Sequence, residues 1–284
     1  MESIGFYIGH ENSVPKANLL YRSLCENTAF ADKCRIVAMV PDGLRAQSVF
    51  EMPTVRFKVP ESCRRIPFAD KMLAAAEFEN RSPGEYLWLD ADSFFFRDVR
   101  FPQKAKICVN PVDMRNIGVR YSDKLGPLWE LLFGYYGLEP ACAGSVTTGI
   151  TRERIYPYYN VGMVRIKESK GVFSETGEVL RRLLALEDIK RLLDSSPLIR
   201  IFLHQAVFSC AVLKMYGDGI RALPYGTNYP LHLHDKDPSP IPFEDVVSIR
   251  YDDYFDRHRA PAIWDSIFNG MENELKSCWY YPDW

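Results

Sequence analysis

The sequence predicts an α/β domain in which a mostly parallel central sheet is flanked by helices. Short apolar segments alternate with segments of helical periodicity over about the first 90 residues, and this alternation is typical of βαβ units. One apolar segment, residues 86–89, runs directly into two acidic residues. Ligands of open α/β sheets bind where such strands end, so this segment marks the expected functional edge.

Composition narrows the classes of function. With 284 residues and a formal net charge of -2, the chain predicts one domain and gives no reason to expect a nucleic-acid partner. No apolar segment reaches the roughly 18 to 20 residues that span a bilayer. No secretory signal is recognisable after Met1. The seven cysteines are scattered without a C-x-x-C pair, which favours reduced thiols over disulfides or a zinc site. We therefore expect a cytoplasmic protein.

The expected elements of the first part alternate in type. They are a strand at 4–8, a polar loop at 9–13, a helix from Pro15 to about Asn27, strands at 35–40 and 55–59, a helix at 68–80 and the strand that ends at Asp90. Apolar residues at helical spacing predict the helices, and apolar segments bounded by turn residues predict the strands.

The rest of the chain continues this alternation, with strands at 106–110, directly after Gly162 and at 246–250, and helices at 128–136, 174–193, 203–215 and 261–276. The helix at 174–193 has the clearest amphipathic pattern, and Ser174 is a candidate N-cap. Residues 143–149 are small and turn-prone, which fits either a mobile lid or a plain surface loop. The aromatic terminus at 278–284 would dock on the domain, meet a partner or contact a membrane surface.

Asp90 and Asp92 are the strongest candidates for site residues. Side chains at i and i+2 of a strand point to the same side, so both carboxylates are expected to face one point. Such a pair repels unless a proton or a cation lies between the two groups. Mg²⁺ is commonly held by one or two carboxylates together with substrate phosphates. The alternative is that Asp90 begins a turn and Asp92 caps it.

Other polar residues are expected near the same edge. The loop at 9–12 follows the first strand and is a candidate nucleotide-binding edge, although the chain has no G-x-G-x-x-G or P-loop motif. Asn160 offers an amide donor and acceptor to a sugar hydroxyl, or it forms a turn before a strand. Gly162 would let a ligand or another backbone approach closely. His204, in apolar company, is more typical of a core histidine.

Two histidines near the end of the chain are candidate metal ligands. His232 and His234 alternate with leucines, so a strand there would place both on one face. Beside Asp235 and Lys236 they are difficult to place in a dry core. A histidine is a competent third ligand for a divalent ion that two carboxylates already hold.

Four pieces, in this order, resemble the GT-A glycosyltransferases, above all the retaining family 8 group that includes glycogenin and bacterial galactosyltransferases. Segment 4–24 is similar to the nucleotide-binding start of that family. Leu87-Trp88-Leu89-Asp90-Ala91-Asp92 resembles its YLDAD motif, with Lys71 upstream where the family has a basic residue. Tyr159-Asn160-Val161-Gly162-Met163-Val164 resembles its FNSGV strand, and His232 and His234 fall where a late metal-binding histidine is expected.

The resemblance implies a GT-A, Rossmann-like fold and one catalytic domain. It divides the chain into a nucleotide-binding half at 1–110, an acceptor and sugar half at 111–250, and a C-terminal helix with the aromatic tail at 251–284. It implies a retaining hexosyltransferase that uses a nucleoside-diphosphate sugar, with a UDP-sugar favoured. The acceptor, whether a glycan, a lipid or a protein, is not identified by the resemblance.

The resemblance also implies roles for individual residues. Mn²⁺ or Mg²⁺ would be held by Asp90, Asp92 and either His232 or His234, and it would neutralise charge on the departing nucleoside diphosphate. The expected catalytic residues are Lys71, which contacts the donor phosphates or sugar, and Asn160 and Gln205, which orient the sugar and its acceptor. The expected donor-binding residues are Ile8, Gly9, His10, Asn12, Lys71, Asp90, Ala91, Asp92 and Lys236.

The sequence departs from the family pattern at two places. His204-Gln205 stands where the family has an Asp-Gln pair, which leaves the donor sugar and the stereochemistry open. Lys236 follows the histidines more closely than the family lysine does. Two alternatives also stay open. One is a haloacid-dehalogenase-type phosphatase with Asp90 as nucleophile, and the other is a degenerate fold that binds a nucleotide-sugar or a protein partner without turnover.

Overall fold

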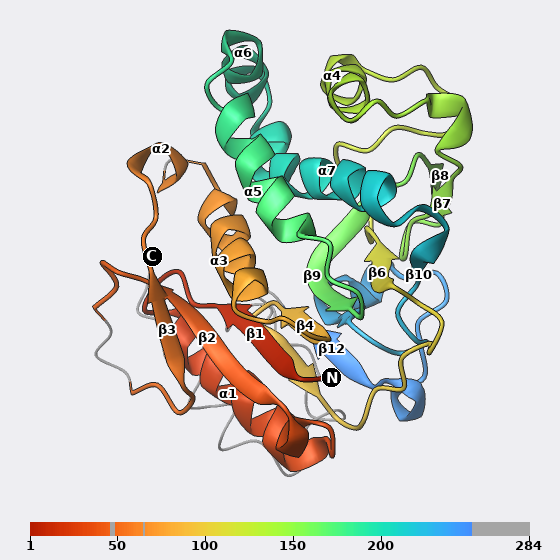
Figure 1. The fold of residues 1–284 in the computed structure, drawn as a ribbon. Helices are drawn as coiled ribbons and strands as arrows, with labels where there is room; N and C mark the ends of the chain where they lie inside the picture. The colour runs from red at the N-terminus through yellow and green to blue at the C-terminus, as the bar shows by residue number, and fades with distance from the viewer. Residues whose placement is uncertain (46–48, 65, 252–284) are drawn as a thin grey trace.

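The structure is a computed structural model that describes residues 1–45, 49–64 and 66–251. Its centre is a seven-stranded sheet with the strand order β10-β6-β9-β4-β1-β2-β3 (Figure 1). The strands are β1 (Ser3–Tyr7), β2 (Arg35–Pro41), β3 (Thr54–Phe57), β4 (Tyr86–Leu89), β6 (Ile107–Pro111), β9 (Tyr159–Ile166) and β10 (Ile220–Arg221). All neighbours run parallel except β9, which is antiparallel to β4 and to β6. The expected mostly parallel sheet is confirmed.

Two smaller sheets complete the strands of the described chain. One has the order β11-β12-β5, built from β11 (Tyr229–Pro230), β12 (Ser248–Arg250) and β5 (Ser93–Phe95). The other is the antiparallel pair of β7 (Val146–Thr147) and β8 (Arg154–Ile155), so the small-residue segment at 143–149 contains a short strand.

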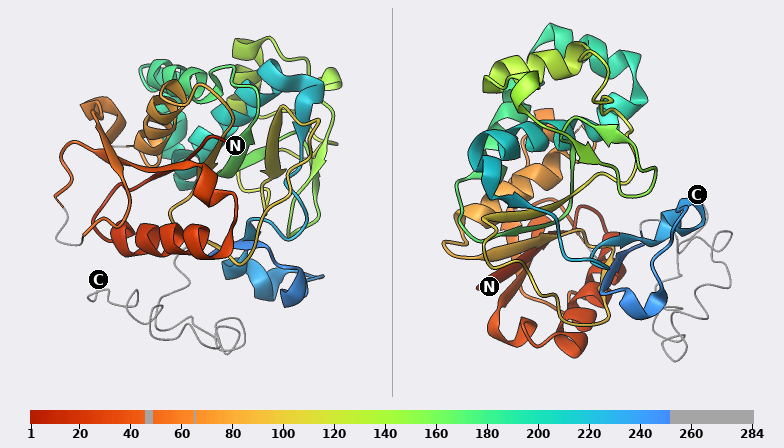
Figure 2. Two further views of the ribbon diagram at one scale, coloured as in Figure 1. Left: turned by 60° about the horizontal axis from the view of Figure 1, so that its bottom comes forward. Right: turned by 90° about the vertical axis from the view of Figure 1, so that its right-hand side faces the viewer.

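Helices cover both faces of the central sheet (Figures 1 and 2). They are α1 (Ser13–Asn27), α2 (Glu61–Arg64), α3 (Ala69–Asn80), α4 (Pro127–Tyr136), α5 (Val172–Leu183), α6 (Glu187–Ser195) and α7 (Pro197–Tyr216). Short 3₁₀ helices lie at Ala31–Lys33, Pro140–Cys142, Gly217–Gly219, Leu231–Lys236 and Phe243–Asp245. α1 covers one face, and α3, α5 and α7 cover the other.

The alternation of side chains along the strands divides the core between these two layers. In β1, Ile4 and Phe6 belong to the cluster on the α1 side. Gly5 faces the opposite layer so closely that an added Cβ would lie 2.6 Å from the ring of Phe78. In β4, Leu87 packs on the α1 side, whereas Trp88 packs on the α3 side. Successive side chains therefore pack on opposite faces of the sheet. The polar residues of the site follow at the ends of these strands.

One expected helix is in fact two. The amphipathic segment at 174–193 divides into α5 and α6, because the backbone at Leu186 is extended with φ -82° and ψ 133°. Ser174 is not the N-cap: Gly171 takes that position with φ 77°, and the Ser174 N–H donates to Glu79 Oε2 at 2.9 Å. The apolar stripe continues across the break, so periodicity alone does not reveal it.

The expected strand with two histidines on one face is also corrected. Residues Leu231–Lys236 form a 3₁₀ helix after Pro230. Successive side chains of a 3₁₀ helix are about 120° apart, so residues at i and i+2 do not share a face. His234 turns towards Tyr229, whose hydroxyl lies 2.9 Å from His234 Nδ1. His232 points in a different direction and lines a cavity at the ends of β1, β4 and β6, which is described below.

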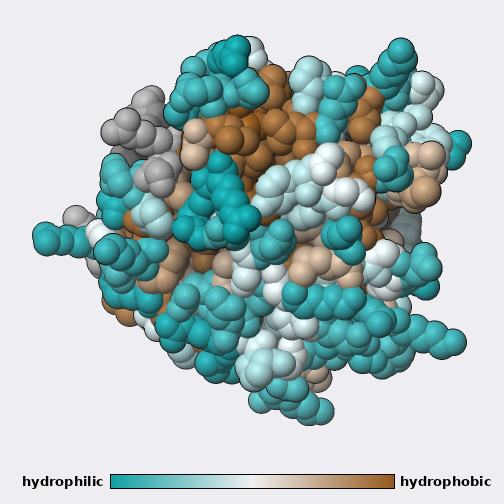
Figure 3. Space-filling model, turned by 45° about the horizontal axis from the view of Figure 1, so that its top comes forward, coloured by the Kyte–Doolittle hydropathy of each residue, from teal (hydrophilic) through white to brown (hydrophobic). Residues whose placement is uncertain are grey.

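α7 is the central scaffold helix. By length and composition alone, the segment Pro197–Gly219 could cross a membrane, which differs from the expectation that no apolar segment is long enough. More than half of its most apolar part is buried inside the molecule. The face in Figure 3 carries an apolar area among hydrophilic side chains. The six cysteines of the described residues are free, and Cys25 and Cys142 are exposed. The expected helix at 261–276 and the aromatic tail lie outside the described residues.

Candidate active site

A cavity of about 700 Å³ opens where β1, β4 and β6 end. Its lining includes Gly9 and His10 from the loop after β1, the turn at 90–92 after β4, and Asp113 after β6. This is the edge at which open α/β sheets bind their ligands. Residues that the sequence places far apart are therefore gathered by the topology around one space.

The two acidic residues lie in a turn that begins directly after β4. The Asp90 N–H donates to the Gly162 carbonyl at 2.7 Å, and the Ser93 N–H donates to the Asp90 carbonyl at 3.2 Å. Asp90, Ala91 and Asp92 all line the cavity, as expected. The strand itself stops at Leu89, so the turn rather than a shared strand face brings the two carboxylates to the cavity.

Lys71 lies opposite this turn. It stands in the first turn of α3, is 8% exposed, and pairs through Nζ with Asp90 Oδ1. The neighbouring Asp70 accepts a hydrogen bond from the Tyr7 hydroxyl at 2.6 Å, which joins the end of β1 to the same helical turn. A buried ammonium beside a carboxylate is thus fixed at the cavity, where the sequence predicted a basic residue.

Arg250 is the principal site residue that the sequence interpretation missed. It is 7% exposed, lines the cavity, and forms an ion pair through Nη2 with Asp113 Oδ2. Burial lowers the pKa of the guanidinium, but the carboxylates of Asp113, Asp92 and Asp90 outweigh burial and raise that pKa above its ordinary value. The available signal was an arginine at the end of the apolar strand predicted at 246–250.

Gly162 has no side chain, and the side chains of three site residues pack against it. A Cβ at that position would lie 2.6 Å from Asp90 Oδ2, 2.8 Å from Asn160 Oδ1 and 3.3 Å from Arg250 Nη1. The close approach predicted for Gly162 is therefore an approach by side chains. Asn160 lines the cavity, and its Oδ1 accepts the Gly162 N–H at 2.6 Å.

α7 contributes His204 and Gln205. Burial, with the charge of Lys71 as a smaller cause, lowers the pKa of His204 to about 3, so the ring is neutral near pH 7. Its Nδ1 lies 2.9 Å from the Ile201 carbonyl, in keeping with the core histidine expected here. Gln205 is 6% exposed and lines the cavity, and its buried Oε1 has no hydrogen-bond partner in the structure. A buried amide oxygen without a partner favours a ligand donor at this point.

Phe68 stands at the N-terminus of α3 in a left-handed conformation, with φ 63° and ψ 4°. Such a backbone is costly for a bulky residue and is often found at functional sites. Phe68 is 45% exposed, and its ring centroid lies 5.0 Å from the His204 ring centroid and 5.8 Å from Lys71 Nζ. The cavity wall beside Lys71 is therefore aromatic.

Some expected site residues lie elsewhere. Ile8 is fully buried in the core on the α1 side. Asn12 occupies the N-cap position of α1, and Lys236 is exposed on the 3₁₀ helix. Neither these three residues nor His234 lines the cavity. Of the expected donor-binding loop, Gly9 and His10 do.

The side chains around the cavity provide only some of the ligands that a metal ion needs. Within the described residues no cluster of three His, Cys, Asp or Glu side chains is arranged to hold a metal ion. Asp90 and Asp92 together fit an ion that is shared with substrate phosphates, which is how Mg²⁺ is usually bound. Of the two histidines expected as a third ligand, His232 lines the same cavity as the two carboxylates and His234 does not.

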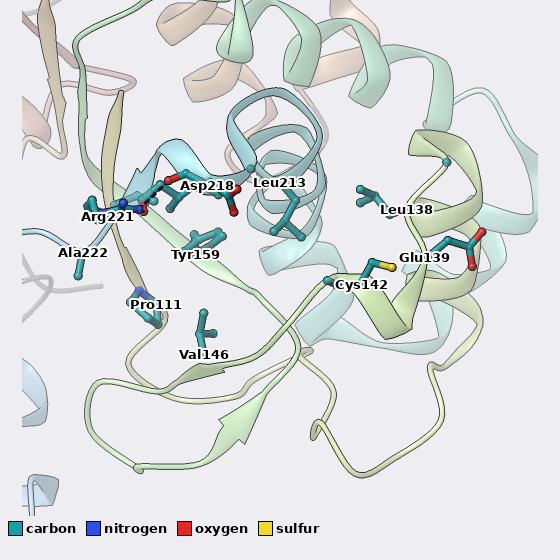
Figure 4. A pocket seen from close by; sticks show the side chains of 15 residues that line it. Pro111, Leu138, Glu139, Cys142, Val146, Tyr159, Leu213, Asp218, Arg221 and Ala222 are labelled. Carbon is teal, nitrogen blue, oxygen red and sulfur yellow. Dashed lines mark hydrogen bonds between the residues drawn. The ribbon is translucent and has the colours of Figure 1, made fainter. Parts of the chain in front are cut away.

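A second cavity of about 640 Å³ lies among β6, β9, α7 and the segment that follows α4 (Figure 4). Leu138, Val146, Tyr159 and Leu213 are among its lining residues. It contains none of the residues that the sequence predicted for a site.

No protein-family model matches the chain, and a search of curated proteins finds no match. Among solved structures, the chain is similar to the apo structure of the bifunctional glycosyltransferase WbbM, with 11% identity, a TM-score of 0.53, and coverage of 98% of this chain and 51% of that one. It is also similar to the galactosyltransferase LgtC in complex with donor and acceptor sugar analogs, with 10% identity, a TM-score of 0.50, and coverage of 99% and 98%. The chain thus spans about half the length of the WbbM chain. At these identities the likeness shows the fold, and we conclude that this chain has the GT-A fold of these glycosyltransferases.

Proposed function

We propose that this chain transfers a hexosyl residue from a nucleoside-diphosphate sugar, with a UDP-sugar favoured, to an acceptor hydroxyl group. One observation carries the proposal: the acidic turn at 90–92, the buried cation of Lys71 and the buried amide of Gln205 line one cavity at the carboxyl edge of a GT-A sheet. LgtC, on the same fold, is described with donor and acceptor sugar analogs. The cavity volume of about 700 Å³ is within the range of small-molecule sites.

The proposed reaction breaks the bond between sugar C1 and the diphosphate oxygen. The acceptor oxygen forms the new bond to C1, and its proton passes to the departing diphosphate, on which negative charge develops as the bond to C1 breaks. Lys71, held by Asp90, would stabilise that charge in a partly water-excluded site. Gln205 Oε1 would accept a hydrogen bond from a sugar or acceptor hydroxyl, and Asn160 would help to orient the same groups.

A divalent ion, Mn²⁺ or Mg²⁺, belongs to the proposal through Asp90 and Asp92. When bound, such an ion would supply Lewis-acid stabilisation of the leaving group. The charges of the cavity agree with this: it is lined by the carboxylates of Asp70, Asp90, Asp92 and Asp113 and by the cations of Lys16, Lys71 and Arg250. The excess of carboxylates would oppose a diphosphate that arrived without a cation.

Retention of the anomeric configuration is proposed on the sequence resemblance to a retaining group. The two alternative functions make different predictions. A degenerate binding protein would bind nucleoside diphosphate without turnover. A haloacid-dehalogenase-type phosphatase would form an acyl-phosphate on Asp90, which chemical trapping would detect.

Isothermal titration calorimetry with UDP and with GDP, each with and without Mn²⁺, tests the proposal. We expect metal-dependent binding of one nucleotide and its loss in Asp90→Ala and Asp92→Ala. Asp188→Ala is the matched control, because Asp188 is exposed on α6 and pairs with Arg191. Binding that is unchanged in both site variants would refute the assignment.

A further inference from the structure

Arg250 is a buried arginine. Backbone pairing between two strands determines its position. β12 pairs antiparallel with β5, and this register sets Arg250 opposite Ser93. The next residue continues the contact, since the Tyr251 N–H donates to the Asp92 carbonyl at 3.0 Å. Because β5 starts immediately after the acidic turn, the pairing places the guanidinium at the acidic pair rather than at the protein surface.

The side-chain geometry agrees with this placement. Arg250 Nη1 and Asp90 Oδ2 approach the same point above Gly162, at 3.3 Å and 2.6 Å from the position of an added Cβ. Asp113 holds the guanidinium from another direction, through Nη2. A guanidinium carries five N–H donors in a rigid fork, so it can contact Asp113 and a phosphate at the same time.

The basic side chains around the acidic pair come from several elements. Of the two candidate histidines, His234 is turned towards Tyr229, and His232 enters the cavity from the 3₁₀ helix. Lys71 lies at the other side of Asp90 through its Nζ contact with Oδ1. The acidic turn is therefore flanked by two buried cations from α3 and β12.

We propose that Arg250 binds the diphosphate of the nucleotide-sugar donor directly and that Asp113 is the residue that positions it. This inference rests on the proposed function. It adds a binding residue and says which residues contact the phosphates and which hold the metal ion. Arg250 and Lys71 contact phosphate oxygens, and any divalent ion would be held by Asp90, Asp92 and the phosphates. Arginine suits this role because its planar fork matches a phosphate with two parallel hydrogen bonds.

Calorimetric titration with uridine, UMP and UDP in the presence of Mn²⁺ tests the inference, with the guanosine series in parallel. In the wild-type protein we expect affinity to rise from nucleoside to diphosphate. Arg250→Gln is expected to weaken diphosphate binding by roughly ten- to a hundredfold, the usual size of a charged hydrogen bond. Nucleoside binding should change by less than about threefold, since no phosphate is present. Arg250→Lys should restore part of the loss, because it keeps the charge but not the fork.

Two further variants separate positioning and folding from direct binding. Asp113→Asn should weaken diphosphate binding less than Arg250→Gln, and it should have little further effect in the Arg250→Gln background. Arg191→Gln, on the exposed face of α6, is the matched control and should bind as the wild type does. Unfolding midpoints and nucleoside affinity report whether each variant keeps the fold.

The outcomes distinguish the two proposals. If the wild-type protein binds UDP or GDP and Arg250→Gln binds it equally well, the inference is wrong while the proposed function stands. An equal loss of nucleoside and diphosphate affinity in Arg250→Gln would show a structural role only and would also overturn the inference. If the wild-type protein binds no nucleoside diphosphate with or without Mn²⁺, the proposed function fails and the inference fails with it.

Discussion

Lys71 Nζ contacts Asp90 Oδ1 and thereby joins the first turn of α3 to the turn that follows β4. The lysine is almost fully buried, whereas the aspartate is half-buried. Removing one member would leave the other charged group in a poorly hydrated place, which is more costly than removing both. The pair is thus a structural contact as well as a candidate part of the catalytic machinery.

A double-mutant cycle should reveal this coupling. Lys71→Met and Asp90→Asn should each lower the free energy of unfolding, and the double variant should lose less than the sum. We expect a coupling energy of about 1 to 3 kcal/mol, the range for residues in direct contact. Urea unfolding of the four proteins measures it. Additive losses would show that the two side chains do not interact in solution.

Gly162→Ala should disrupt the cluster around Asp90. The added methyl group would lie 2.6 Å from Asp90 Oδ2 and 2.8 Å from Asn160 Oδ1, so side chains must move. We expect a loss of about 1 to 3 kcal/mol in stability, together with loss of nucleotide binding. Gly134→Ala is the control, because Gly134 lies within α4 and an added Cβ has nothing within 4 Å. That change should stabilise the helix by up to about 1 kcal/mol.

His204 should make stability depend on pH. Its pKa in the folded protein is about 3, below the value of about 6.5 for an unfolded chain. Between these values the unfolded state binds more protons, so stability falls as the pH falls through this window. From pH 7 to pH 5 the contribution of His204 should fall by about 2 kcal/mol. Urea unfolding at several pH values should show a shallower dependence in His204→Phe. An identical slope in both proteins would contradict a buried neutral histidine.

Substitutions of Phe68 can separate the free-energy cost of its left-handed backbone from the contribution of its ring contacts. Phe68→Gly relieves the left-handed backbone but removes the ring from His204 and Lys71. Phe68→Ala removes the ring and keeps the backbone cost. We expect the glycine variant to be more stable than the alanine variant by about 1 kcal/mol, and both to lose sugar transfer to a similar extent. Equal stability of the two variants, measured by urea unfolding, would argue against a left-handed residue at this position.

Much of the fold follows from local patterns in the sequence. The apolar segments around Phe6 and Trp88 predict buried strands, and the acidic turn after Leu89 predicts the functional edge. These signals are local, because burial on both faces of a strand determines the residue types within it. The expectation that Lys71 lies at the cavity came from the family resemblance rather than from a local pattern.

The parts that local patterns could not supply depend on pairing between distant segments. Arg250 reaches the acidic turn only because β12 pairs with β5 and sets Arg250 opposite Ser93. The directions of His232 and His234 depend on the 3₁₀ helix that follows Pro230, where alternation with leucine suggested a strand. The break at Leu186 is similarly hidden, since apolar periodicity continues through it.

Proton NMR of the purified protein with a panel of UDP- and GDP-hexoses and Mn²⁺ tests the central claim most directly. We predict that one donor is consumed, that nucleoside diphosphate appears in equal amount, and that the first-formed sugar product keeps the anomeric configuration of the donor. The activity should be lost in Asp90→Asn and kept in Asp188→Asn. A product of inverted configuration would refute retention alone. The absence of donor turnover above the Asp90→Asn level, in a protein that still binds the nucleotide, would contradict sugar transfer and favour a binding protein.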